Sequence, residues 1–221
     1  METTLSAAKK YFSDVILGTV KILPDSLVIM TGIYALLTLS ASFAVMFGGL
    51  LEASALFRLI QVVSIYLGIT DSITEGVPEA TQRQCQTGFR AADLTTLSMF
   101  GGYDRPAFPS PPLYILSVAA AYIFSSLNAQ SQELQALGTA YSSRYYISVI
   151  MLCTAILAFM MFRLYNSCDK ISVVISTVPI GLIIGALIFE QNRRLFGPMM
   201  VNLLGIPLIA NKATISVCKA T

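Results

Sequence analysis

The residue types on which most protein chemistry depends are scarce in this chain of 221 residues. It contains no histidine, which removes the commonest general acid or base and the commonest metal ligand. A Ser-His-Asp or Cys-His mechanism is therefore excluded within this chain, as are haem held by histidine and zinc sites that use histidine. We predict that the chain is not an enzyme and that it holds neither a cofactor nor a metal.

The four cysteines are Cys85, Cys153, Cys168 and Cys218. None of them forms a C-x-x-C pair, which disfavours a zinc site made of cysteines alone. Cys153 lies in the middle of an apolar run, where a cysteine usually acts as a small buried apolar residue. Cys85 and Cys168 could pair if both faced an oxidising compartment, and the sequence leaves this open.

The acidic residues flank the longest apolar runs. We expect no Asp or Glu in the interior of a span, which excludes a mechanism based on two intramembrane aspartates. Asp169 and Glu190 border the two clearest runs, and we interpret both as solvated boundary charges. The net charge is only +2 and the basic residues are scattered, which disfavours a nucleic-acid partner.

Long uncharged runs indicate that the chain lies in a membrane. It is 55% hydrophobic and 12% charged, whereas a soluble domain is about 25% charged. The run from Ser26 to Leu51 is uncharged, and a helix needs roughly 20 apolar residues to cross a bilayer core. Residues 145–162 and 171–189 form two further runs, and residues 106–132 are also uncharged. We therefore predict an all-α fold, a polytopic membrane helix bundle of about five transmembrane helices.

The order of apolar and polar segments divides the chain into five regions. One of them, residues 25–69, is a predicted transmembrane hairpin, and its first helix is expected to end near Gly48-Gly49. The second arm, 53–69, carries Arg58 and Gln61 and is either a span or an interfacial helix. The regions are an amphipathic interfacial helix (1–24), the transmembrane hairpin (25–69), a polar Pro/Gly-rich loop (70–111), a three-helix transmembrane region (112–194) and an apolar re-entrant or surface tail (195–221).

Small residues at fourth positions mark candidate helix-packing faces. Ser40, Ala44 and Gly48 form one such series, and Gly181 and Gly185 form a G-x-x-x-G pair. Pro179 lies within the last long apolar run, where we expect it to kink the helix. Such spacing also occurs by chance in apolar helices, so the series are candidates for packing rather than proof of it.

The distribution of basic residues predicts the orientation. With the hairpin counted as two spans, eight basic residues fall on the side of the N-terminus and of the 70–111 loop, against three on the other side. Because basic residues favour the cytoplasmic side, this count places the N-terminus and the loop in the cytoplasm.

The 70–111 loop is the best candidate for a contact surface, because loops carry binding residues more often than spans do. Its candidate protein-contact residues are Arg83, Arg90, Asp93, Tyr103, Asp104 and Arg105. A polar loop with these residues favours a structural or interaction role for this membrane protein.

Two alternative functions remain open. One is a small transporter or channel with a path lined by Arg58, Gln61 and the helix of Pro179. The other is a membrane-shaping hairpin formed by the apolar stretch 26–69.

Three segments resemble small multi-span membrane proteins of large icosahedral DNA viruses that infect algae and protists. They are FPSPPLYILSVAAAYIFSSLNAQSQELQALG, AYSSRYY and NRRLFGPMMVNLLGIPLI. The resemblance implies a virion protein in the membrane beneath the capsid, or a membrane-anchored minor capsid component. The expected partners are then the lipid bilayer and other membrane or shell proteins, within an oligomer or a larger assembly and without nucleic acid. The resemblance assigns no functional residue.

Overall fold

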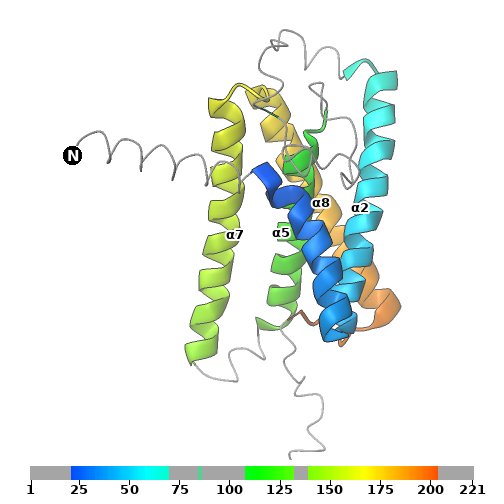
Figure 1. Cartoon of the computed structure of the whole chain (residues 1–221), viewed down its shortest axis with the longest axis vertical. Helices are drawn as coiled ribbons and strands as arrows, with labels where there is room; N and C mark the ends of the chain where they lie inside the picture. The colour runs from blue at the N-terminus through cyan, green and yellow to red at the C-terminus, as the bar shows by residue number, and fades with distance from the viewer. Residues whose placement is uncertain (1–20, 70–84, 86–107, 132–138, 204–221) are drawn as a thin grey trace, which may run out of the picture.

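The computed structural model describes residues 21–69, 85, 108–131 and 139–203, and its regular elements are helices (Figure 1). They are an unlabelled helix, Lys21–Thr38, followed by α2 (Ala41–Tyr66), α5 (Pro111–Ala129), α7 (Thr139–Tyr165) and α8 (Ile171–Phe196). All five of these helices are long and apolar enough to cross a membrane. The predicted all-α membrane bundle is therefore confirmed. The amphipathic helix predicted for the N-terminal region lies largely outside the described residues.

The helices run alternately up and down, which defines two ends of the bundle (Figure 1). We call the end where α7 connects to α8 end A, at the top of Figure 1, and the opposite end, with the turn before α2, end B. The described part of the first helix runs through Pro24 without a break, so the boundary predicted at residues 24 and 25 is wrong.

The turn of the N-terminal hairpin lies at Leu39 and Ser40, not near Gly48-Gly49 as predicted. Leu39 has a φ of 50°, in the left-handed region, and Ser40 is the extended N-cap residue of α2. Serine is favoured at an N-cap, but no glycine, proline or charge marks this turn in the sequence. The two glycines lie inside α2, and the second arm of the hairpin is longer than expected.

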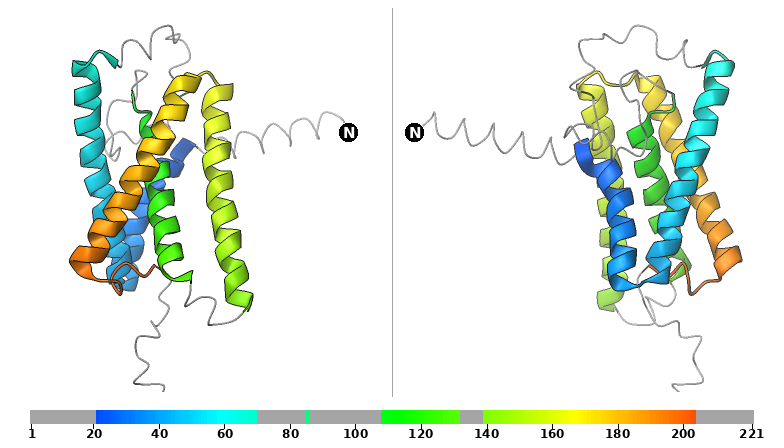
Figure 2. Two further views of the ribbon diagram at one scale, coloured as in Figure 1. Left: turned by 180° about the vertical axis from the view of Figure 1, so that it is seen from behind. Right: turned by 45° about the vertical axis from the view of Figure 1, so that its right-hand side comes forward.

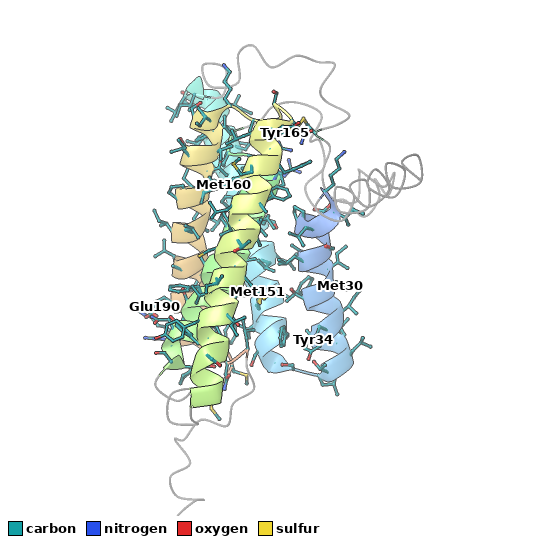
Figure 3. All side chains as sticks on the ribbon, turned by 90° about the vertical axis from the view of Figure 1, so that its left-hand side faces the viewer. Met30, Tyr34, Met151, Met160, Tyr165 and Glu190 are labelled. Atoms are coloured by element: carbon teal, nitrogen blue, oxygen red, sulfur yellow. A yellow bond between two sulfur atoms is a disulfide. The ribbon has the colours of Figure 1, made fainter. Side chains whose placement is uncertain are left out.

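The central helix of the bundle is α5, which the other helices surround (Figure 2). Of its apolar stretch, 72% is buried within the protein, against 11% for α7. Its main apolar partners come from α2 and α8, and they include Leu50, Phe57, Ile188 and Phe189. Phe57 of α2 contacts Tyr114 of α5, and Phe189 of α8 contacts Tyr122 of α5. The outer faces of the helices carry exposed apolar side chains such as Met30 and Met151 (Figure 3), as expected of surfaces in contact with lipid.

The closest helix contact joins α5 to α8 through the two glycines of the G-x-x-x-G pair. A Cβ atom on Gly181 would lie 2.7 Å from Cβ of Ser117, and one on Gly185 would lie 2.8 Å from Cβ of Ala121 and overlap the Val118 carbonyl oxygen. The absence of side chains lets the two backbones approach this closely. α8 continues through Pro179 as one helix.

The described part of the C-terminal tail turns back beneath α5 at end B. α8 ends at Phe196, its C-cap residue Gly197 has a φ of 86°, and residues 198–201 form turns. Ser126 Oγ donates a hydrogen bond to the Val201 carbonyl oxygen at 2.8 Å, and Val201 is buried. Up to residue 203 the tail therefore covers the end of the bundle and does not cross the membrane.

Candidate functional site

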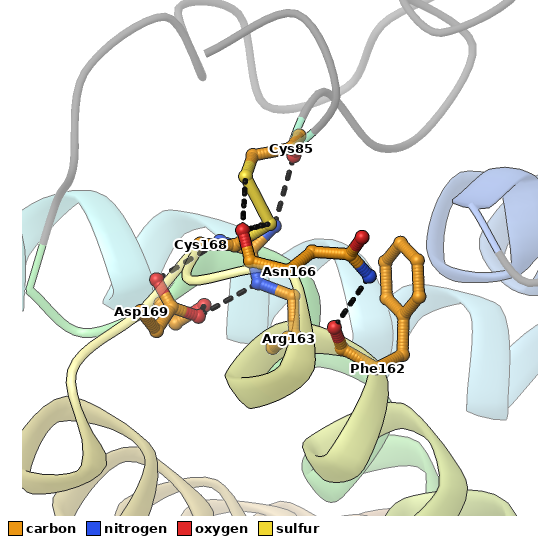
Figure 4. Close-up of a disulfide and its surroundings, with 7 residues drawn as sticks. Cys85, Phe162, Arg163, Asn166, Cys168 and Asp169 are labelled. Atoms are coloured by element: carbon orange, nitrogen blue, oxygen red, sulfur yellow. Dashed lines mark hydrogen bonds and ion pairs between the residues drawn. A yellow bond between two sulfur atoms is a disulfide. The ribbon is translucent and has the colours of Figure 1, made fainter. Parts of the chain in front are cut away.

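A disulfide joins the long loop to the α7–α8 connection at end A (Figure 4). Cys85 and Cys168 are bonded with their Cα atoms 5.3 Å apart, which settles the pairing that the sequence leaves open. Arg163 Nη1 donates a hydrogen bond to the carbonyl oxygen of Cys85 at 2.9 Å. The middle of the loop is therefore attached to the bundle through both a covalent bond and a charged donor.

Beneath the disulfide lies a buried ion pair. Arg163 Nε and Nη2 donate to the two carboxylate oxygens of Asp169 at 2.7 and 2.9 Å, in the bidentate arrangement typical of strong pairs. Both residues are buried, so the interpretation of Asp169 as a solvated boundary charge is wrong. The reason is a tight turn after α7, in which Ser167 has a φ of 53° and the Cys168 amide donates to the Arg163 carbonyl oxygen.

The start of α5 joins the same polar cluster. Ser110 Oγ donates to Asp169 Oδ2 at 2.7 Å, and the Ser110 backbone amide donates to Thr177 Oγ1 on α8 at 3.0 Å. All three residues are buried. The long loop is thus attached at its middle through Cys85 and at its end through Ser110. We call the residues Cys85, Ser110, Arg163, Cys168, Asp169 and Thr177 the end-A cluster.

A second polar site lies between α2 and α8, in a cavity of about 380 Å³ near end B. Its acidic group is Glu52, which the predicted hairpin places between its two arms. Glu52 is instead an interior residue of the 26-residue helix α2, roughly 17 Å from the helix start at about 1.5 Å per residue. The expectation that no span contains an acidic residue is therefore wrong. A charge near the centre of a bilayer costs about 2.5–3.5 kcal/mol on insertion scales, so such residues usually have a function.

Two polar side chains of α8, Gln191 and Asn192, line the same cavity as Glu52. Gln191 Nε2 donates to Glu52 Oε1 at 2.9 Å, and the Asn192 amide nitrogen lies 3.4 Å from the Tyr122 hydroxyl and 3.5 Å from the Val45 carbonyl oxygen. Glu190 takes no part, because it pairs with Arg193 and Arg194 on the surface of α8 at 3.2 and 2.9 Å (Figure 3).

The predicted N-terminal packing series does not form one packing face. Ser40 belongs to the turn, whereas Ala44 and Gly48 line the cavity beside Glu52. A Cβ on Gly48 would meet no atom within 4 Å, whereas one on Gly49 would lie 2.9 Å from Ile188. Gly49 is therefore the closely packed glycine of α2. The four-residue spacing in the sequence pointed to Gly48 instead.

The remaining predicted residues are dispersed or outside the described chain. Arg58 lies on the exposed face of α2, with its Nη1 3.5 Å from Gln61 Oε1, and neither residue lines the cavity beside Glu52. Pro179 is exposed on α8, so the structure does not assemble the predicted transport path from these three residues. The candidate contact residues of the loop, from Arg83 to Arg105, lie outside the described residues.

An apolar cavity of about 430 Å³ lies between α5, α7 and α8. Cys153 lines it and is exposed, so its interpretation as a buried core residue is wrong. Because α7 packs loosely against its neighbours, a residue in the middle of its apolar run still reaches the surface.

No family model matches the chain, and neither a curated protein nor a solved structure matches it.

Proposed function

We propose that this chain is a structural integral membrane protein that presents its long loop, after residue 69, to another protein. The observation that carries the proposal is the attachment of this loop by the end-A cluster. An unrestrained long loop costs little free energy, because the entropic cost of closing a loop grows only slowly with its length. A disulfide and a buried charged pair that both restrain the loop therefore indicate that its position matters, as it does for a contact surface.

The resemblance to viral membrane proteins extends this proposal to a setting. In a virion, the partner would be a component of the protein shell, and the chain would link the membrane to that shell. The outer faces of the helices, exposed and apolar, would then serve anchoring in lipid, while end A would serve protein contact.

The contact proposal predicts the loss of a partner when the loop sequence changes at constant length. We replace residues 87–105 by a Gly-Ser segment of equal length, which keeps Cys85 and its disulfide. Cross-linking in native membranes followed by quantitative mass spectrometry should recover at least one protein with the wild-type chain and not with this variant. A control variant replaces the tail residues 208–215 in the same way and should retain the partner.

Membrane insertion of the loop variant should be unchanged, as measured by resistance to alkaline extraction. An identical set of cross-linked proteins for the wild-type chain and the loop variant would contradict the proposal.

The orientation of end A is part of the same proposal. The count of basic residues favours the cytoplasm, but disulfides persist in oxidising compartments and are rare in the cytosol. We propose that end A, with the long loop, faces an oxidising compartment, because the orientation bias is a statistical tendency whereas a bonded pair requires oxidation.

This orientation predicts which reagent reaches the disulfide. In a variant with Cys153 and Cys218 replaced by serine, a membrane-impermeant maleimide should label Cys85 and Cys168 only after reduction. With an impermeant reductant, labelling should occur only from the side that faces the oxidising compartment. A Ser40→Cys variant without the other cysteines serves as control and should be labelled from the opposite side. Labelling of unreduced protein, or labelling from the cytoplasmic side, would refute the orientation.

A further inference from the structure

The cavity between α2 and α8 combines one acidic group with apolar walls. Glu52 lies deepest along α2, Ala44 and Gly48 form the α2 wall toward end B, and Leu195 and Phe196 belong to the α8 wall. Gly48 leaves the interior open, because a Cβ there would meet no atom within 4 Å. A volume of about 380 Å³ falls in the range of small-molecule sites, which are mostly apolar with a few placed polar groups.

The carboxylate of Glu52 retains unused capacity for hydrogen bonds. It accepts one bond from Gln191, although an ionised carboxylate offers about four acceptor positions. No described lysine or arginine forms a salt bridge with it, since Glu190 engages the nearby Arg193 and Arg194. The cavity therefore offers an acidic group that the described part of the chain leaves without a cation.

The composition of the walls determines which cation fits. Calcium takes about six to eight oxygen ligands, whereas only Glu52, Gln191 and Asn192 carry side-chain oxygens among the lining residues. A primary ammonium group needs fewer acceptors, because it has three donors. An apolar body attached to it would lie along Leu195 and Phe196, and an aromatic ring also favours a nearby cation.

We propose that this cavity binds a primary ammonium group, with Glu52 as the anionic partner and the apolar walls holding the carbon chain next to it. The ammonium group can belong to a free amine or to a phosphatidylethanolamine headgroup that enters from end B, because Ala44 and Phe196 lie in the terminal turns of their helices. The proposal is independent of the loop contact at end A.

The test measures binding of n-hexylammonium to the full chain in nanodiscs of phosphatidylcholine, a lipid without a primary amine. Isothermal titration calorimetry should show saturable binding to the wild-type chain and no binding of n-hexanol, the neutral analogue. Glu52→Gln keeps the shape of the side chain and removes its charge, and it should weaken binding at least about tenfold, since losing a charged hydrogen bond has about this effect. Arg58→Gln, which changes a charge on α2 outside the cavity, should bind like the wild-type chain.

A second variant tests the cavity without touching the charge. Gly48→Leu places a side chain in the open space and should also abolish hexylammonium binding, while circular dichroism shows an unchanged helical content. This variant keeps the proposal testable if Glu52→Gln does not fold.

The source of the ammonium group is decided by repeating the titration in nanodiscs that contain phosphatidylethanolamine. A weaker apparent affinity of the wild-type chain would support the lipid headgroup as ligand, and an unchanged affinity would support a free amine. Equal binding by the wild-type chain and Glu52→Gln would overturn the proposal. Equal binding of hexanol and hexylammonium, or no saturable binding in phosphatidylcholine, would overturn it as well.

Discussion

Replacement of Gly185 by leucine should separate α5 from α8 and destabilise the bundle by about 3 kcal/mol, the upper part of the usual range for overpacking. A Cβ at this position would already overlap the Val118 carbonyl oxygen and lie 2.8 Å from Cβ of Ala121. The obstacle is the backbone of a buried helix, which a change of side-chain rotamer cannot relieve. Thermal unfolding of the purified protein in detergent, followed by circular dichroism, measures the effect.

Gly48 provides the matched control for this experiment. It is also a glycine inside a membrane-spanning helix, but a side chain there would enter open space. Gly48→Ala should therefore unfold at the same temperature as the wild-type chain or slightly above it, because alanine favours helix over glycine by about 1 kcal/mol. If Gly185→Leu unfolded at the wild-type temperature, the close α5–α8 contact would be disproved.

Replacement of Asp169 by asparagine should cost about 3–5 kcal/mol, as expected when one partner of a buried ion pair is removed. The change leaves the charge of Arg163 buried without its bidentate acceptor, and it weakens the bond from Ser110 Oγ, which now joins Asp169 Oδ2 at 2.7 Å. We expect the attachment at Ser110 to weaken together with the loss of stability, while the disulfide still holds the loop at Cys85. Thermal unfolding measures the stability, and limited proteolysis near Ser110 measures the weakened attachment.

A double variant distinguishes the loss of a favourable pair from the burial of an isolated charge. Arg163→Met combined with Asp169→Leu removes both charges and should be clearly more stable than Asp169→Asn, because apolar residues can replace a buried pair at little cost. Glu190→Gln, at an exposed pair, should have little effect, since surface ion pairs contribute little. A small effect of Asp169→Asn, similar to that of Glu190→Gln, would show that the end-A pair is not buried in solution.

The membrane setting and the helical class could be predicted because they depend on local composition. A run of apolar residues without charge is unstable in water, and in lipid its backbone groups must bond within the segment, which requires a helix. The uncharged runs 145–162 and 171–189 accordingly lie within α7 and α8. The same local pattern predicts two spans between Cys85 and Cys168. Because a chain that crosses the membrane twice returns to its starting side, both cysteines are expected at one end of the bundle.

The positions of individual residues within the bundle could not be predicted in the same way. Leu39 and Ser40 form a turn without any of the usual turn residues, and this shift by about ten residues moves Glu52 from a predicted connection into the interior of a span. From its position between two apolar runs, Asp169 was predicted to be a solvated boundary charge. The turn after α7 instead places its carboxylate against the guanidinium group of Arg163.

By itself, then, the sequence determined that this chain is a bundle of apolar helices in a membrane, because hydropathy is a property of each segment taken alone. Only the tertiary structure decided that Gly49 packs while Gly48 lines a cavity, that Asp169 is buried and that Glu52 lies beside Gln191. In lipid, apolar faces of helices gain little from choosing one apolar neighbour over another. Close backbone contacts and polar pairs between distant segments select the arrangement, and a linear pattern does not show which partners meet.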